Sequence, residues 1–282
     1  MKQTLLPHLK PEPLLQAANP EHNKSKQWVA GIDVGSRTTK VVILSSGRIL
    51  ASSVLDTGIN AEKSAETALM LARQKAGISK GWPGAVVGTG YGRVSISFLE
   101  KTATELTCHA RGCHFLNPEI RTVIDIGGQD SKVVHLDADG GMVDFVMNDK
   151  CAAGTGKFLE MVARTLELDL TDMADMQSGT AQACTINSMC AVFAETEIIS
   201  LLAKKQVPQD IVSGINRAFA TRIGNMVKRL GIKRPLAFVG GVAKNKGLAN
   251  ALVDYLGVPF TPLDIDPQLT GALGAAVQAQ QI

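Results

Sequence analysis

One strand-turn-strand pattern occurs twice in this chain of 282 residues, and it limits the possible folds more than any other feature. Residues 32–44 align with residues 124–136, with seven identities among the thirteen aligned pairs. Each copy has Asp and Gly at its turn and is followed by a third strand pattern, at 48–55 and 142–147, and then by a helical pattern. A supersecondary unit repeated at domain-sized spacing predicts two related α/β domains that face each other.

Periodic patterns outside the repeat predict the remaining elements. Apolar positions at helical spacing predict a helix at 60–76, and short apolar runs predict strands at 235–242 and near 258–260. In the C-terminal half the predicted helices are 155–168, 191–205, 208–231, 244–256 and 270–279. The last of these helices is rich in Gly and Ala, which would let another backbone come close, so we expect it to cross back to the first domain.

Composition and the N-terminal segment exclude several classes of protein. A net charge of +3 without a basic run argues against nucleic-acid binding, and the apolar runs are far shorter than the ~20 residues of a membrane span. Residues 1–27 carry four prolines, no periodic pattern and no export signal, so we predict a mobile tail on a cytoplasmic protein. Five cysteines, an odd number, are then expected to be thiols or metal ligands rather than disulfides.

The Asp-Gly turns of the repeat have a use in phosphate binding. Backbone N–H groups of such a turn can contact phosphate oxygens, and Asp33 and Asp125 could hold Mg²⁺ through water. One such turn alone is usually an ordinary hairpin, but two copies together with glycine-rich segments near 240 and 271 favour a nucleotide site. A P-loop is excluded, because the G-T-G-K at 154–157 lacks the earlier glycine and is followed by Phe158. The candidate nucleotide-binding residues are Asp33, Gly35, Ser36, Thr38, Thr39, Lys40, Asp125, Gly127, Gly128, Gly240, Gly241, Asn245, Gly271 and Ala272.

This arrangement of motifs resembles the actin, Hsp70 and hexokinase superfamily. The resemblance implies an α/β fold with two facing ribonuclease-H-like domains, each with a mixed sheet, and a nucleotide cleft between them. It also implies a first domain of residues 28–117 plus 262–282 and a second domain of residues 118–261. By the same resemblance, Gln129 or Asp130 would orient the attacking water. Sugar kinases, chaperones and filaments share this fold, so the fold alone does not name a function.

Two cysteines stand just before predicted helices, Cys151 and Cys190. A helix N-terminus favours a thiolate, and four thiolates are the usual ligand set of a [4Fe-4S] cluster. Two cysteines per chain suffice if a two-fold axis passes through the cluster, because a dimer supplies each ligand twice. The alternatives from spacing alone are small buried side chains, or a single-chain zinc or Fe–S site drawn from all five cysteines, although their spacings match no standard pattern.

Residues 103–110, 148–160 and 190–200, together with both Asp-Gly turns, closely resemble the activator ATPases of 2-hydroxyacyl-CoA dehydratases. The ATPase subunits of benzoyl-CoA reductases belong to the same family, and the resemblance covers residues 28–282. It implies that Cys151 and Cys190 bind one oxygen-sensitive [4Fe-4S] cluster between two identical subunits. Cys113 and Cys184 are outside that ligand pattern and are assigned packing roles, whereas Cys108 lies in a family-like segment without an assigned role.

The resulting hypothesis is a homodimer that binds ATP and Mg²⁺ in both clefts and carries one electron from a ferredoxin or flavodoxin to a dehydratase- or reductase-type metalloenzyme. Lowering a one-electron potential by about 300 mV needs roughly 7 kcal/mol, more than the ~1–3 kcal/mol typical of allosteric coupling. Hydrolysis of ATP to ADP must therefore drive the cycle. The alternatives are a sugar or small-molecule kinase with incidental cysteines, or a redox-sensing ATPase.

Overall fold

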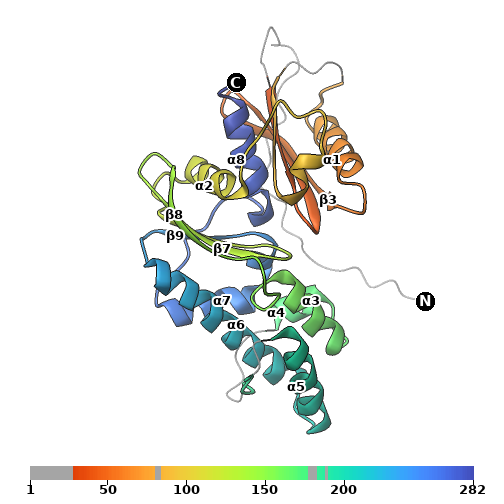
Figure 1. Cartoon of the computed structure of the whole chain (residues 1–282), viewed down its shortest axis with the longest axis vertical. Helices are drawn as coiled ribbons and strands as arrows, with labels where there is room; N and C mark the ends of the chain where they lie inside the picture. The colour runs from red at the N-terminus through yellow and green to blue at the C-terminus, as the bar shows by residue number, and fades with distance from the viewer. Residues whose placement is uncertain (1–27, 80–83, 177–182, 188–189) are drawn as a thin grey trace, which may run out of the picture.

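The computed structural model describes residues 28–79, 84–176, 183–187 and 190–282. The predicted tail, 1–27, lies outside the described residues. Two sheets, each covered by helices, form an upper and a lower lobe (Figure 1). The fold is therefore α/β, as predicted from the repeat, and both sheets are mixed, as the superfamily resemblance implies.

The first sheet has the strand order β3-β2-β1-β4-β5. Its first three strands are antiparallel neighbours, whereas β4 and β5 run parallel to β1. Alternate residues of the central strands face opposite sides, so one face packs on helix α1 and the other on helix α8. The elements are β1 (Trp28–Val34), β2 (Thr38–Ser45), β3 (Arg48–Asp56), α1 (Ala61–Lys75), β4 (Val86–Thr89), the 3₁₀ helix η1 (Tyr91–Ser95), β5 (Lys101–Thr102) and α8 (Thr270–Ala279).

The second sheet repeats this design with the order β8-β7-β6-β9, in which β9 runs parallel to β6. The register repeats as well, because Asp33 pairs with Lys40 in the first sheet and Asp125 pairs with Lys132 in the second. The elements are β6 (Thr122–Ile126), β7 (Ser131–Leu136), β8 (Met142–Asn148), α3 (Gly156–Thr165), α4 (Leu170–Asp175), α5 (Ala191–Ala203), α6 (Pro208–Leu230), β9 (Leu236–Val239), η2 (Gly241–Lys244), α7 (Lys246–Leu256) and η3 (Pro267–Leu269).

Helix α2 (Glu105–Leu116) lies between the two sheets and packs closely on α8 (Figure 1). A Cβ atom added to Gly274 would lie 1.8 Å from the carbonyl oxygen of Cys108, and one added to Gly31 would lie 2.0 Å from that of Ala272. The small residues of α8 thus allow the close backbone approach that we expected of this helix. The limits of the two domains stay a prediction, because α2 contributes side chains to the cores on both of its sides.

Strands β4 and β5 and helices α2 and α4 have no counterpart among the elements predicted from the sequence. The apolar period does not predict α2, because this helix is buried on two faces and lacks the single apolar stripe of a surface helix. The strand predicted near 258–260 is only an isolated bridge between Phe260 and Leu236. Among the described residues, no helix combines the length and the apolar character that crossing a bilayer requires.

Candidate nucleotide site and cysteine segments

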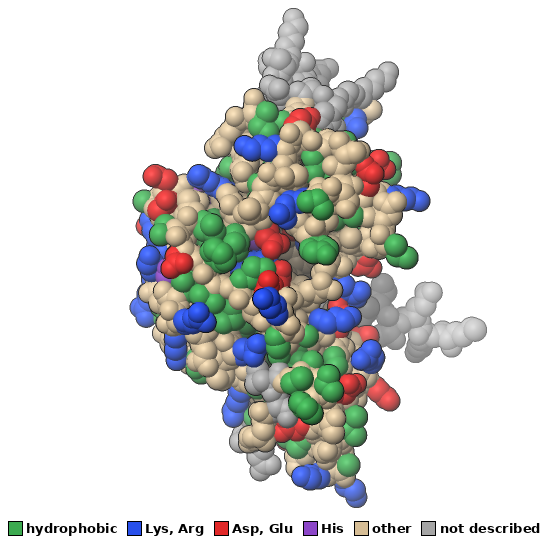
Figure 2. Space-filling model, viewed as in Figure 1, with side chains coloured by type: hydrophobic (Ala, Val, Ile, Leu, Met, Phe, Trp, Pro, Cys, Tyr) green, Lys and Arg blue, Asp and Glu red, His purple; other side chains and the backbone are tan. Residues whose placement is uncertain are grey.

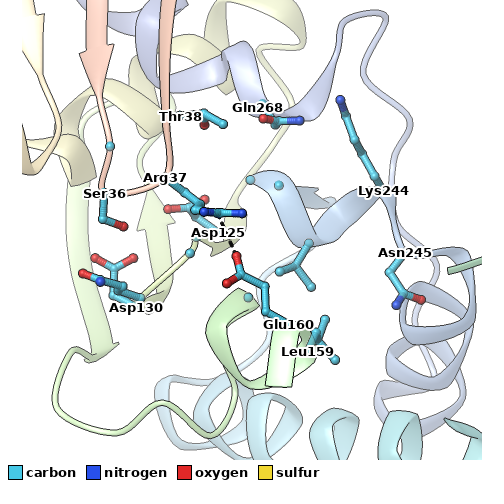
Figure 3. Close-up of a pocket in the computed structure, with 18 of the residues that line it drawn as sticks. Ser36, Arg37, Thr38, Asp125, Asp130, Leu159, Glu160, Lys244, Asn245 and Gln268 are labelled. Atoms are coloured by element: carbon cyan, nitrogen blue, oxygen red, sulfur yellow. Dashed lines mark ion pairs between the residues drawn. The ribbon is translucent and has the colours of Figure 1, made fainter. Parts of the chain in front are cut away.

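A cavity of about 540 Å³ lies between the lobes, where the two Asp-Gly turns face each other (Figure 3). It brings together most of the residues predicted to bind a nucleotide or orient water. These are Asp33, Gly35, Ser36, Thr38, Lys40, Asp125, Gly127, Gly128, Gln129, Asp130, Gly240, Gly241 and Asn245. The sequence repeat therefore folds into one shared site rather than two separate ones.

Three of the predicted nucleotide-binding residues are not among those that line the cavity. Thr39 is fully buried, and its hydroxyl lies 3.0 Å from that of Thr57, which in turn donates to the carbonyl oxygen of Gly35. This side chain supports the first turn from behind. Gly271 lies behind Asp33, since a Cβ there would be 2.9 Å from the Oδ2 atom of Asp33, and Ala272 packs on β1.

Lys132 lies at the centre of a buried charged cluster beneath the second turn. Its Nζ is 2.7 Å from Oδ1 of Asp130, 3.3 Å from Oδ2 of Asp125 and 3.6 Å from Oε1 of Glu105. Burial acts to lower the pKa of Lys132, but the three carboxylates outweigh it and raise the pKa above its ordinary value. The first turn has a simpler arrangement, in which Lys40 is 3.0 Å from Oδ2 of Asp33.

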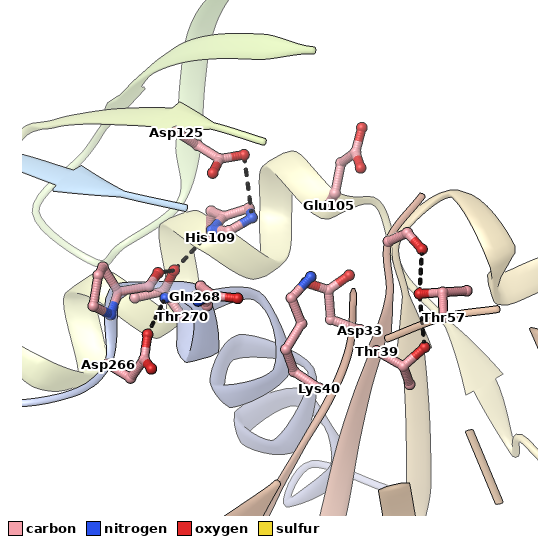
Figure 4. Close-up of polar contacts among 12 residues, drawn as sticks. Asp33, Thr39, Lys40, Thr57, Glu105, His109, Asp125, Asp266, Gln268 and Thr270 are labelled. Atoms are coloured by element: carbon pink, nitrogen blue, oxygen red, sulfur yellow. Dashed lines mark hydrogen bonds and ion pairs between the residues drawn. The ribbon is translucent and has the colours of Figure 1, made fainter. Parts of the chain in front are cut away.

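His109 connects this cluster to the C-terminal helix (Figure 4). Its Nε2 is 3.3 Å from Oδ2 of Asp125, and its Nδ1 is 2.9 Å from the hydroxyl of Thr270. Burial acts to raise the pKa of Asp125, but the charges of His109 and Lys132 outweigh it and hold that pKa below its ordinary value. The carboxylate of Asp125 is therefore kept ionised, as magnesium binding would require.

Glu105 and His109 line the cavity but were not among the predicted site residues. Burial raises the pKa of Glu105, with Lys132 acting against the rise, so this carboxyl is better suited than an exposed one to accept a proton from water. Both residues belong to segment 103–110, which resembles the activator ATPases, but that resemblance implied no role for Glu105 or His109.

Two glycines occupy equivalent positions in the two lobes. Gly90 follows β4 with φ +83°, and a Cβ there would lie 2.4 Å from Oδ1 of Asp33. Gly240 follows β9 with φ +85°, and a Cβ there would lie 2.5 Å from Oδ1 of Asp125. Each glycine thus keeps backbone close to the aspartate of its lobe, and the repeat extends further than the aligned sequence indicates.

Cys151 is half-buried and precedes α3, and hydrogen bonds attach its segment to the second turn. The backbone N–H groups of Gly156 and Lys157 donate to the carbonyl oxygens of Gly127 and Gly128, at 2.9 Å and 2.8 Å. The Ser131 hydroxyl also donates to the carbonyl oxygen of Gly154, at 2.6 Å. The loop that carries Cys151 is therefore bonded directly to the turn that faces the cavity.

Cys190 is exposed and occupies the N-cap position of α5, where its carbonyl oxygen accepts a hydrogen bond from the backbone N–H of Ala194. Helices α3 and α5 pack together, and Arg164 of one lies 3.9 Å from Glu195 of the other. The two cysteines thus precede neighbouring helices. Across the described segments, no group of three or more His, Cys, Asp or Glu side chains is arranged to hold a metal ion.

The other three cysteines have packing environments. Cys113 is fully buried in the core under the second sheet, which agrees with the packing role expected for it, and burial raises its pKa. Burial also raises the pKa of Cys108 to about 12, and that side chain contacts α8. Cys184 is partly exposed, and its backbone N–H donates to the carbonyl oxygen of Asp210.

Residues 30–279 match the BadF/BadG/BcrA/BcrD ATPase family. The chain belongs to this family. Family membership identifies it as an ATPase, in agreement with the nucleotide site predicted from the repeat. The match takes in both sheets and all the lining residues of the cavity.

Two relatives illustrate this membership. The chain is 43% identical over 253 residues to the 2-hydroxyisocaproyl-CoA dehydratase activator of Clostridioides difficile. The aligned region covers 89% of this chain and 94% of the relative. It is 41% identical over 254 residues to the (R)-2-hydroxyglutaryl-CoA dehydratase activating ATPase of Acidaminococcus fermentans, with 89% and 96% covered. These similarities confirm the family resemblance recognised in the sequence.

Solved structures confirm the fold. The Clostridium difficile activator of 2-hydroxyisocaproyl-CoA dehydratase with bound ADPNP superposes with a TM-score of 0.85 at 42% identity, covering 90% of this chain and 94% of that one. A glucokinase from Streptomyces griseus also superposes, with a TM-score of 0.54 at 15% identity and with 90% and 100% covered, which shows the shared fold alone. The predicted actin, Hsp70 and hexokinase type of fold is therefore confirmed, and the kinase alternative is not favoured.

Proposed function

We propose that this chain is an ATP-driven activator that passes one electron to a partner enzyme of the 2-hydroxyacyl-CoA dehydratase or benzoyl-CoA reductase type. The names of its relatives support an activator role, and one of them is a benzoyl-CoA reductase subunit from Thauera aromatica, 29% identical with 88% of this chain covered. The observation that carries the proposal is the hydrogen bonding between the start of α3, which directly follows the Cys151 loop, and the turn at Gly127 and Gly128. It connects the candidate ATP site to a candidate metal ligand.

In this proposal ATP binds in the cavity with its phosphates between the two turns. The side chains present suit it, because Gly90 and Gly240 leave room beside both aspartates and the turns offer backbone N–H groups. Mg²⁺ would be held through water by Asp33 and Asp125, where it would neutralise phosphate charge. Each aspartate also contacts a lysine, so magnesium and lysine together would offset the negative charge of the phosphates.

Three side chains could orient or deprotonate the attacking water. Gln129 is exposed at the second turn, and Asp130 accepts a hydrogen bond from Lys132, so both can be directed at the terminal phosphate as the superfamily resemblance implies. Glu105 approaches the same cavity from α2, and its raised pKa favours proton transfer. We assign the proton-accepting role to Glu105 and the orienting role to Gln129 or Asp130.

Cys151 and Cys190 would hold one [4Fe-4S] cluster between two copies of the chain. The donor set fits, because both thiols are at least partly exposed, both stand before helices and a two-fold axis would supply four of them. When bound, the cluster would serve as a one-electron carrier that receives its electron from a ferredoxin or flavodoxin.

The surface beside Cys190 supports a homodimer. Val192 and Phe193 of α5 are 69% and 67% exposed, and Ile199 of the same helix is 55% exposed. Hydrophobic side chains are visible together on the lower lobe in Figure 2, the lobe that contains α5 in Figure 1. A second copy would cover such side chains, which monomeric proteins rarely expose together.

The test is the iron and acid-labile sulfide content of protein purified without oxygen. We expect about four of each per dimer, and we expect both Cys151→Ala and Cys190→Ala to lose them while ATP binding is kept. Cys184→Ala is the matched control and should keep the cluster. Iron-free wild-type protein, or a cluster retained in both ligand variants, would contradict the assignment.

A second measurement tests the activator role. The reduced, cluster-loaded dimer should activate a supplied 2-hydroxyacyl-CoA dehydratase with ATP but not with ADP. Activation without hydrolysis, measured with a non-hydrolysable analogue at equal rate, would show that hydrolysis does not drive the electron transfer.

A further inference from the structure

Arg37 bridges the two lobes across the mouth of the cavity. Its Nε lies 2.9 Å from Oε1 of Glu160, and Figure 3 shows the two side chains reaching toward each other from the first turn and from α3. The carbonyl oxygen of Arg37 accepts a hydrogen bond from the backbone N–H of Thr57, which fixes the position of its backbone. Its backbone is therefore anchored, whereas its side chain is 64% exposed.

Arg37 stands where the two turns approach each other closely. A Cβ added to Gly128 would lie 3.2 Å from Cβ of Arg37 and 3.3 Å from Oγ of Ser36. A nucleotide whose phosphates lie between the turns would place its terminal phosphate beside this contact. The guanidinium of Arg37 would then be close enough to form an ion pair either with that phosphate or with Glu160.

The lysines that line the cavity have other carboxylate partners. Lys40 and Lys132 have side chains that are 12% and 3% exposed and are held by the aspartates of their own lobes. Lys244 and Lys246 bond to Asp266 and Asp175 at 2.6 Å and 3.0 Å.

Lys246 is at least as exposed as Arg37, but Arg37 differs because it carries a guanidinium and because its carboxylate partner belongs to the opposite lobe. An exposed ion pair contributes little free energy, whereas a guanidinium binds a phosphate through two parallel hydrogen bonds.

We propose that Arg37 exchanges Glu160 for the terminal phosphate of ATP and so makes the cleft select ATP over ADP. The inference rests on the nucleotide cleft of the proposed function. ADP has no phosphate at that position, so Arg37 stays on Glu160 and α3 stays tied to the first lobe. ATP takes Arg37 away and releases α3, the helix whose N-terminal N–H groups hold the second turn and whose preceding loop carries Cys151.

The experiment compares the affinities of ADPNP and ADP for the full-length protein by titration calorimetry without oxygen. We expect Arg37→Gln to weaken ADPNP about tenfold or more and to change ADP less than about twofold, because a charge-assisted hydrogen bond is lost with ADPNP alone. We expect Glu160→Gln to strengthen ADPNP by about two- to fivefold, since Arg37 no longer has a competing carboxylate. In the double variant, the Glu160 change should have no further effect.

Lys157→Gln is the matched control, because Lys157 is the other cation that contacts Glu160, at 3.3 Å, and it stands on the same helix. This variant should leave both affinities unchanged. Equal weakening of ADPNP and ADP by Arg37→Gln, or no gain with Glu160→Gln, would overturn the exchange while leaving the cleft intact. A wild-type protein that binds neither nucleotide would instead refute the proposed nucleotide cleft itself.

Discussion

Replacing Lys132 by methionine tests the charged cluster beneath the second turn. The side chain is 3% exposed and its Nζ lies within 3.6 Å of three carboxylates, those of Asp125, Asp130 and Glu105. At 3.3 Å and an effective dielectric constant near 20, one such contact has a Coulomb energy of about 5 kcal/mol before desolvation is subtracted. Methionine has a similar length, so the change removes the charge without leaving a large cavity.

The expected loss is about 3–5 kcal/mol in the free energy of unfolding near pH 8, the usual cost of breaking a buried ion pair. Lys40→Met is the matched control from the repeat. Among the described residues, Lys40 forms an ion pair with Asp33 alone, and it is more exposed than Lys132, so we expect a loss about half as large. Both values come from urea unfolding followed by circular dichroism, without nucleotide.

The pH dependence separates a charge effect from a packing effect. Without Lys132, burial at Glu105 is opposed less, so the raised pKa of this carboxyl rises further, and Asp125 loses one of the charges that lower its pKa. Relative to the unfolded state, the folded variant therefore binds more protons than the folded wild type does. The deficit of the variant relative to the wild type therefore shrinks as pH falls, and it should be at least about 1 kcal/mol smaller near pH 5.5 than near pH 8. A deficit below about 1 kcal/mol, or one that does not change with pH, would refute the assigned role of the ammonium group.

Three further predictions use other parts of the site. Gly274→Ala should destabilise the protein by about 2–3 kcal/mol, because its Cβ would meet a backbone carbonyl of α2. Gly224→Ala is the control and should cost less, because its Cβ would meet a tyrosine ring. Equal losses of stability in urea unfolding would contradict this prediction. Glu105→Gln should lower kcat for ATP hydrolysis about a hundredfold with little change in KM, and an unchanged kcat would exclude Glu105 as proton acceptor. Gly240→Ala should abolish the rise in melting temperature caused by ATP, whereas Gly47→Ala, which has a similar φ but open space around it, should keep that rise.

The sequence predicted the parts of this site that form between residues close together in the chain. Each Asp-Gly turn joins two strands, so the register that sets Asp33 against Lys40 and Asp125 against Lys132 follows from a short hairpin. The helices with one apolar stripe were predicted close to their observed limits for the same reason.

Residues placed by tertiary packing were not predictable in this way. Glu105 and His109 enter the cavity from α2, whose two buried faces remove the period that would mark it as a helix. The contact of Arg37 with Glu160 depends on how the two lobes lie against each other, which no local pattern encodes. The equivalence of Gly90 and Gly240 was missed because the strands before them differ in sequence and only their backbone geometry repeats.

The two halves of the repeat have the same backbone arrangement but make different contacts. Both of their turns contact helix α3, each in its own way. The second turn accepts hydrogen bonds from the first N–H groups of α3, at Gly156 and Lys157, and the first turn reaches the same helix through Arg37. The helix that follows Cys151 is therefore in direct contact with both turns. Since α3 also packs on α5, which begins at Cys190, the structure provides one short route from the nucleotide cavity to both candidate cluster ligands.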